Sequence, residues 1–167
     1  MSPALRGLAG ILMIALAGCG STGKPPLPPV EPFELERFMG DWYVIASIAT
    51  WFERDAFAAV ETYRLREGSS PPEVDVLFRF RRGSFEAPVK TMESTGFVEP
   101  EQPSQWDIQF FWPLRLDYRV IHIDPEYRFT VIGRRARDYV WMMARSPEIE
   151  PEDYEDLVEV VREAGYD

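Results

Sequence analysis

The chain of 167 residues has little of what most metal and catalytic sites are built from, because it contains one cysteine and one histidine. A single cysteine excludes an intramolecular disulfide, a zinc ribbon and an iron–sulfur cluster, and a single histidine excludes a multi-histidine metal centre. Basic residues are also scarce, with 18 Lys and Arg against 28 Asp and Glu. Because phosphate backbones are bound by clustered cations, this balance predicts no nucleic-acid partner.

Aromatic residues, by contrast, are abundant, at 14% of the chain, and every one of them lies at or after Phe33. The length is typical of one domain with a core that needs no disulfide or metal. The aromatic distribution places that core after residue 32.

The first 18 residues have the pattern of a secretory signal. Arg6 precedes about ten apolar residues, a run too short for a comfortable transmembrane span. The run ends in Leu16–Cys19, which resembles the bacterial lipobox, where the signal is cut before an acylated cysteine. We therefore predict a signal peptide over 1–18 and lipidation of Cys19, against the alternative of an ordinary buried cysteine. Gly20 in place of aspartate implies the outer membrane by analogy with Gram-negative sorting.

Residues 19–32 are predicted to form a tether, since five prolines fall within 25–32. Such a segment favours an extended polyproline II spacer of roughly 40 Å at ~3.1 Å per residue. Acyl chains, at ~0.8 kcal/mol per buried methylene, supply the anchoring. A ligand for a proline-reading domain is the alternative.

Beyond Phe33, apolar and polar residues alternate with a period of two, which predicts β-strands. Turn-forming clusters separate them, and no helix connects one strand to the next. The eight strands are expected near 41–49, 59–66, 74–81, 90–98, 106–110, 116–123, 127–134 and 139–145. This order predicts an all-β fold, an eight-stranded antiparallel up-and-down barrel.

One helix is predicted after the strands. Pro151 suits its first position, acidic residues follow in the first turn, and Gly165 can end it. Tyr154, Leu157, Val158, Val161 and Ala164 form an apolar stripe, which is expected to pack against the barrel rather than bind a partner.

Three motifs resemble those of the lipocalin family. Gly40–Tyr43 resembles the Gly-x-Trp motif of the first strand, 121–127 the turn between the sixth and seventh strands, and 138–147 the arginine-terminated last strand. The resemblance covers 33–167 and is closest to bacterial outer-membrane lipoproteins of the apolipoprotein D-like branch. It implies a barrel with a C-terminal helix outside it and a cavity for one small ligand.

The resemblance also assigns structural roles. Trp42 and Arg145 are implied to meet at the closed end of the barrel, guanidinium over indole. Gly40, Asp124 and Tyr127 complete the motifs. The second motif departs from the animal version at 123–125, so a receptor contact of that loop does not carry over. The disulfides of the animal members are absent.

Strand alternation nominates the residues that line the cavity, although the same alternation describes a filled core. The nominated ligand-binding residues are Tyr63, Val76, Phe78, Phe80, Trp106, Ile108, Phe110, Tyr139, Trp141 and Glu61. Glu61 shares the face of Tyr63, and the alternatives are that it faces solvent or pairs with an arginine. Trp51, Phe52, Phe111 and Trp112 lie in loops, where they are candidates for ligand access or membrane contact.

A basic run and the single histidine are the other candidates for ligand contacts. Arg79, Arg81 and Arg82 are expected on a solvated face, with a lysophospholipid phosphate site as the alternative. His122 is a candidate haem ligand or general base, but a lone histidine on a strand is more often a packed or surface residue. No nucleophile elbow or phosphate-binding glycine loop is found.

The sequence therefore predicts a membrane-anchored lipocalin that binds, stores or transports a fatty acid or lysophospholipid, with no cofactor, metal or catalysis. Its partners are that lipid and the outer membrane, through N-terminal acyl chains, and a homodimer stays open. One alternative is an envelope assembly lipoprotein that docks a protein on the barrel surface. Another is an enzyme acting on a bound isoprenoid or prostaglandin-like substrate through Glu61 or His122.

Overall fold

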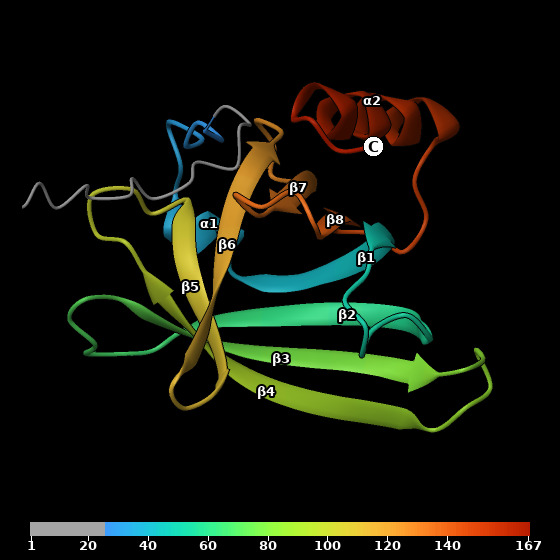
Figure 1. Ribbon diagram of the computed structural model, residues 1–167, viewed down its shortest axis with the longest axis horizontal. Helices are drawn as coiled ribbons and strands as arrows, with labels where there is room; N and C mark the ends of the chain where they lie inside the picture. Colours follow the sequence, from blue (N-terminus) through green and yellow to red (C-terminus); the bar gives the residue numbers. More distant parts are fainter. Residues whose placement is uncertain (1–25) are drawn as a thin grey trace, which may run out of the picture.

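The computed structural model describes residues 26–167, which form one closed barrel of eight antiparallel strands, each paired with its sequence neighbour (Figure 1). The barrel closes where the first strand pairs with the last. The strands are β1 (Gly40–Ile48), β2 (Ala56–Leu65), β3 (Glu73–Arg82), β4 (Val89–Val98), β5 (Gln105–Phe111), β6 (Leu114–Ile123), β7 (Phe129–Gly133) and β8 (Val140–Ala144). The predicted eight-stranded barrel is confirmed, with strand ends displaced by up to three residues.

Alternation sorts the strand residues between the inside and outside of the barrel. In β3, Val74, Val76, Phe78 and Phe80 are all buried, and the residues between them are more exposed. Burying each such side chain stabilises the fold by about 1.5–3 kcal/mol, and the two-residue period keeps the buried face constant along the strand.

The contact between β4 and β5 is short. Only Thr95–Val98 pair with Trp106–Gln109, so β4 and the β5–β6 hairpin diverge beyond this point. Figure 1 shows β5 leaving the direction of β4. Residues 89–94 of β4 therefore have no partner on β5, which matters for the cavities described below.

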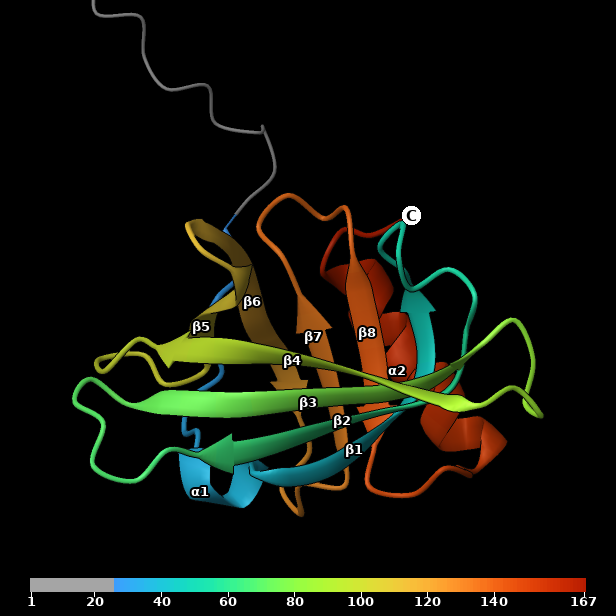
Figure 2. The same ribbon diagram turned by 90° about the horizontal axis from the view of Figure 1, so that it is seen from below.

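Helix α2 (Pro151–Glu163) lies outside the barrel beside β7 and β8 (Figures 1 and 2). Leu157 of the helix packs with Val131, Val140 and Met142 of these strands in a second apolar cluster. The expected packing role of the helix is confirmed, although Tyr154 of the predicted stripe is exposed. The helix also explains why β8 is apolar on both faces, since one face meets the helix and the other the barrel interior.

The closed end is held by a short helix that the sequence analysis did not predict, α1 (Leu35–Phe38). Arg145 joins this helix to β1, because its Nη2 atom donates to the carbonyl oxygens of Arg37, Phe38 and Met39 at 2.8–3.1 Å and its Nη1 atom to that of Asp41 at 2.8 Å. The guanidinium lies 3.8 Å from the centre of the Trp42 ring, which is the contact implied by the resemblance.

The remaining motif residues lie at the same end. Gly40 has φ +97°, and a Cβ atom there would lie 3.3 Å from Nη1 of Arg145. Asp124 accepts the backbone N–H groups of Arg128 and Phe129 at 2.6 Å each, which holds the turn between β6 and β7. The Tyr127 hydroxyl accepts the N–H of Glu34 at 2.7 Å and so fixes the entering chain.

The described part of the predicted tether does not stand free of the barrel. Leu27 is buried and Val30 packs against the main core, because these two apolar residues gain contacts that an extended spacer lacks. The spacer interpretation of 19–32 is therefore wrong for residues 27–30. The predicted signal peptide 1–18 and Cys19 lie outside the described residues. Within residues 26–167, no helix has the length and apolarity needed to cross a bilayer.

Candidate functional site

The barrel encloses a cavity between its closed end and its open end, with about 50 Å³ of free space. Seven of the ten nominated residues line it: Glu61, Val76, Phe78, Ile108, Phe110, Tyr139 and Trp141. Apolar side chains from β3, β5 and β8 converge here because their strands present alternate residues to the barrel interior. The ambiguity between a lined cavity and a filled core is thereby resolved in favour of a cavity at these positions.

Three nominated residues have other places. Tyr63 and Trp106 fill the closed end, where their rings and that of Phe38 lie 5.3–5.6 Å apart in tilted and edge-to-face pairs. The cavity-lining role predicted for Tyr63 and Trp106 is wrong, because strand parity places a side chain inside the barrel without giving its depth. Phe80 instead lines a depression at the open end.

The bottom of the cavity is polar. Glu61 is buried and accepts a hydrogen bond from the Tyr63 hydroxyl, which is in turn hydrogen-bonded to the Tyr118 hydroxyl. Burial raises the pKa of Glu61 to about 7, against the opposing effect of the Tyr63 hydrogen bond. Glu61, whose orientation strand alternation left open, faces the barrel interior, and its hydrogen-bond partner is Tyr63 rather than an arginine. We call Glu61, Tyr63 and Tyr118 the floor cluster.

A second acidic residue, Glu53, lines the upper part of the cavity. It comes from the β1–β2 loop and accepts the hydroxyl of Thr50 at 2.5 Å. Burial raises the pKa of Glu53, and its charge adds to the rise in the pKa of Glu61. The two carboxyl groups therefore disfavour an anionic ligand group deep in the barrel.

A depression of about 680 Å³ lies beyond the cavity at the open end of the barrel, and we call it the mouth. Phe52, Phe110 and Tyr139 line both spaces and so form the partition between them. Trp51 and Phe111, which also line the mouth, are 76% and 65% exposed. Such exposure of large apolar side chains marks a surface that contacts an apolar partner.

Two cations at the mouth have no acidic partner among the described residues. Lys90 of β4 and Arg82 of β3 both line it, and Arg82 donates only to the backbone oxygen of Phe52, at 3.2 Å. Arg134 also lines the mouth, but it pairs with Asp138 at 3.1 Å. The mouth thus combines exposed aromatic rings with positive charge that is free to meet an anion.

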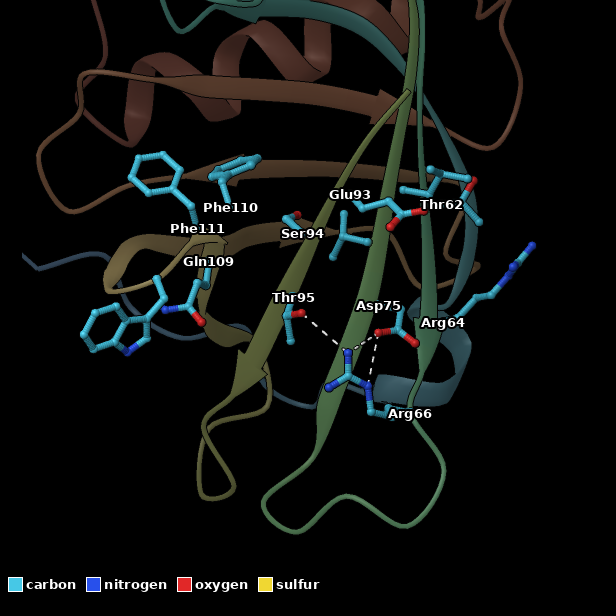
Figure 3. A pocket seen from close by; sticks show the side chains of 13 residues that line it. Thr62, Arg64, Arg66, Asp75, Glu93, Ser94, Thr95, Gln109, Phe110 and Phe111 are labelled. Carbon is cyan, nitrogen blue, oxygen red and sulfur yellow. Dashed lines mark hydrogen bonds and ion pairs between the residues drawn. The ribbon is translucent and has the colours of Figure 1, made fainter. Parts of the chain in front are cut away.

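A separate hollow of about 600 Å³ lies on the outside of the sheet where β4 and β5 diverge (Figure 3). Its surface is crossed by ionic contacts, since Arg66 binds Asp75 and reaches the Thr95 hydroxyl at 3.5 Å. Val76, Ser94 and Phe110 line both this side hollow and the cavity. Although larger than the cavity, the hollow is polar and open, so it does not offer the apolar enclosure that small-molecule sites require.

The other charged candidates are placed by the structure as follows. Arg79 pairs with Asp41 at 3.1 Å, and Arg81 donates to the backbone oxygen of Ala87, so both serve the outer wall. Arg82, expected on a solvated face with them, lines the mouth. His122 does not line the cavity, and burial lowers its pKa, so it offers no charge to a ligand there.

Sequence reasoning missed part of the site. Thr50 and Glu53 come from a loop, where alternation carries no information, and Met92 and Ser94 come from a strand whose pattern is weak. Tyr118 and Leu116 lie on the same face of β6, and both line the cavity. The alternation along that strand was the signal that could have identified Tyr118. Among residues 26–167, no group of three or more His, Cys, Asp and Glu side chains is placed to hold a metal ion.

Comparison with known proteins agrees with this geometry. The family model of the lipocalin-like domain matches residues 33–167. The chain is 30% identical over 147 residues to the outer membrane lipoprotein Blc of Escherichia coli, covering 85% of this chain and 81% of the relative. It is 31% identical over 159 residues to bovine apolipoprotein D, covering 89% and 80%.

Among solved structures, insecticyanin of the tobacco hornworm Manduca sexta superposes with a TM-score of 0.64, covering 84% of this chain and 78% of that one. The sequence identity of that pair is 16%, so this likeness concerns the fold alone. From the family model, the relatives and the barrel together, the chain belongs to the lipocalin family, in the bacterial lipoprotein branch that is similar to apolipoprotein D.

Proposed function

We propose that this lipocalin binds a fatty acid or a lysophospholipid in the barrel cavity and stores or transports it at the bacterial outer membrane. The observation that carries the proposal is the gradient along the barrel axis: a largely apolar cavity lies behind a mouth whose Arg82 and Lys90 have no acidic partner within residues 26–167. Burial of the acyl chain supplies affinity at about 25 cal/mol per Å², and the cations hold the anionic headgroup.

Binding requires the partition to open, because a cavity of about 50 Å³ is far smaller than sites for small molecules, which span about 300–1,000 Å³. Phe52, Phe110 and Tyr139 separate the cavity from the mouth, and their rings rotate more readily than the strands move. Trp141 lines the cavity, so its fluorescence is expected to change when a chain enters.

The test is titration of the delipidated protein with palmitate and with lysophosphatidylethanolamine, followed by calorimetry and by tryptophan fluorescence. We expect micromolar or tighter binding of at least one of them. Val76→Trp, which fills the cavity, is expected to abolish binding, and Leu77→Trp, on the outer face of the same strand, to leave it unchanged. Thermal melting of both variants checks folding, and failure of both lipids to bind wild-type protein overturns the proposal.

Anchoring is the second part of the proposal. Cys19 follows a signal-like segment, and the similar Blc proteins of Escherichia coli and Vibrio cholerae are outer membrane lipoproteins. Cys19→Ser is expected to abolish incorporation of labelled palmitate and to release the protein from the outer-membrane fraction. Unchanged fractionation of that variant overturns the anchor.

Catalysis and protein docking have less support. One carboxylate oxygen of Glu61 is taken by the Tyr63 hydroxyl, and His122 lies outside the cavity, so the cavity holds no histidine general base for a substrate. A solid barrel would favour a docking role, whereas this barrel encloses a cavity. We therefore assign binding rather than turnover.

A further inference from the structure

The floor cluster crosses the inside of the barrel. Glu61 and Tyr63 lie on β2 and Tyr118 lies on β6, two strands that are not paired in the sheet. With Glu61 ionised, the Tyr118 hydroxyl donates to that of Tyr63, and the Tyr63 hydroxyl donates to Oε2 of Glu61. Burying polar groups costs free energy, and an alkyl chain needs no hydrogen-bonding partner. Three hydrogen-bonded groups at the base of the cavity therefore indicate a ligand with a polar group at that end.

The cluster leaves one oxygen for a ligand. Glu61 lines the cavity, and no hydrogen bond from the described residues reaches its Oε1 atom, while Oε2 is taken by Tyr63. Tyr118 lines the cavity beside it, whereas Tyr63 is buried in the closed end. The remaining walls near Glu61, such as Val76, Phe78 and Ile108, offer no hydrogen bond. A ligand group that reaches the floor therefore meets the free Oε1 atom of Glu61 with the Tyr118 hydroxyl beside it, and Ser94 of β4 is a further polar side chain of the cavity wall.

Charge determines which end of a lipid reaches that position. Glu53, Glu61 and Asp117 all line the cavity, and Arg134, the cation that lines it with them, is paired with Asp138. A carboxylate or phosphate is therefore repelled there and attracted to Arg82 and Lys90 at the mouth. An anionic lipid is therefore held with its headgroup outward and the far end of its chain against the floor cluster.

We propose that Glu61 and Tyr118 recognise a hydroxyl group on the buried end of the lipid chain. This proposal rests on the proposed function, since it specifies the lipid that the same cavity takes. A hydroxyl has one O–H donor, which Oε1 of Glu61 can accept. An ammonium has three N–H donors, of which this one free acceptor would leave two without a partner. The partly protonated state of Glu61, whose pKa burial raises to about 7, further favours a neutral partner.

The experiment compares palmitate with its ω-hydroxy derivative by calorimetry on the delipidated full chain. We expect the hydroxy lipid to bind at least about fivefold more tightly, since a buried hydrogen bond contributes about 1 kcal/mol. Glu61→Leu is expected to remove this preference and Glu61→Gln to keep it, because glutamine retains a hydrogen-bonding oxygen. Tyr118→Phe is expected to reduce the preference, and Ile108→Val to weaken both lipids equally.

Each other outcome overturns the proposal in a distinguishable way. Equal affinities of wild-type protein for the two lipids remove the hydroxyl site and leave the lipid-binding function intact. Tighter binding of the ω-amino derivative replaces the hydroxyl with an ammonium. A preference that survives in Glu61→Leu moves the site away from the floor cluster. Absence of binding by any of the lipids overturns both proposals. If Glu61→Leu does not fold, Tyr118→Phe decides the role of the cluster.

Discussion

The two ends of the barrel differ in how completely their side chains are satisfied. At the closed end Trp42 is fully buried, donates its indole N–H to Phe38 at 2.8 Å and lies under Arg145. At the open end Trp112 is 85% exposed, and Lys90 has no acidic partner among residues 26–167. The closed end therefore supplies stability, and the open end keeps apolar surface and charge available for a ligand.

The largest expected effect tests this division with one chemical change at both ends. Trp42→Ala is expected to lower the free energy of unfolding by about 4 kcal/mol, because it removes a large ring from a packed core. Trp112→Ala is expected to change it by less than about 0.5 kcal/mol. Urea denaturation measures both, and similar losses at the two ends would break the comparison.

The pH dependence of stability tests the cluster that lies between the two ends. Burial raises the pKa of Glu61 from 4.5 to about 7, so the folded chain binds more protons than the unfolded chain between these pH values. The contribution of Glu61 to the free energy of unfolding therefore falls as pH rises from about 4.5 to about 7, by up to about 3 kcal/mol, and is level above.

Glu61→Gln isolates this contribution, because glutamine does not titrate. The stability of the variant relative to wild type is expected to increase with pH over that window. His122, whose pKa is lowered by burial, acts in the opposite direction but is common to both proteins and cancels in the difference. A difference that is independent of pH would show that Glu61 titrates normally in the folded barrel.

A smaller effect is expected when Arg145 at the closed end becomes lysine. The ammonium has no planar fork to reach the carbonyls of 37–39 and lie over Trp42 at once, so we expect a loss of about 2 kcal/mol. Arg162→Lys on the exposed face of α2 is the matched control and is expected to change stability by less than about 0.5 kcal/mol. Thermal melting that is unchanged in Arg145→Lys contradicts the assigned role.

The smallest effect is expected for a charge at the mouth. Lys90→Gln is expected to leave thermal melting unchanged and to weaken palmitate binding by about threefold, since an exposed ion pair contributes less than about 1 kcal/mol. The difference is expected to shrink at high salt. Arg128→Gln, at the closed end, is expected to leave the affinity unchanged, and an equal loss in that variant refutes headgroup binding at the mouth.

Sequence patterns predicted the strands well because alternation is a local property that burial imposes on every second residue. They did not predict α1, which has four residues and depends on contacts of Leu35 and Phe38 with the barrel. They left the orientation of Glu61 open and placed Tyr63 at the wrong depth. Depth depends on strand tilt and on the rings that fill the closed end, and neither is encoded in the period of a strand.

By itself, the sequence determined the number and order of the strands and the family. Only the tertiary structure decided which interior residues enclose space and which fill it. It also decided that Glu61 lies inside the barrel and binds Tyr63, which is in turn hydrogen-bonded to Tyr118 of β6, and that Glu53, from a loop, shares the cavity. The reason is physical: a periodic pattern reports which face of a strand is buried, whereas a cavity depends on how distant side chains fill the enclosed volume.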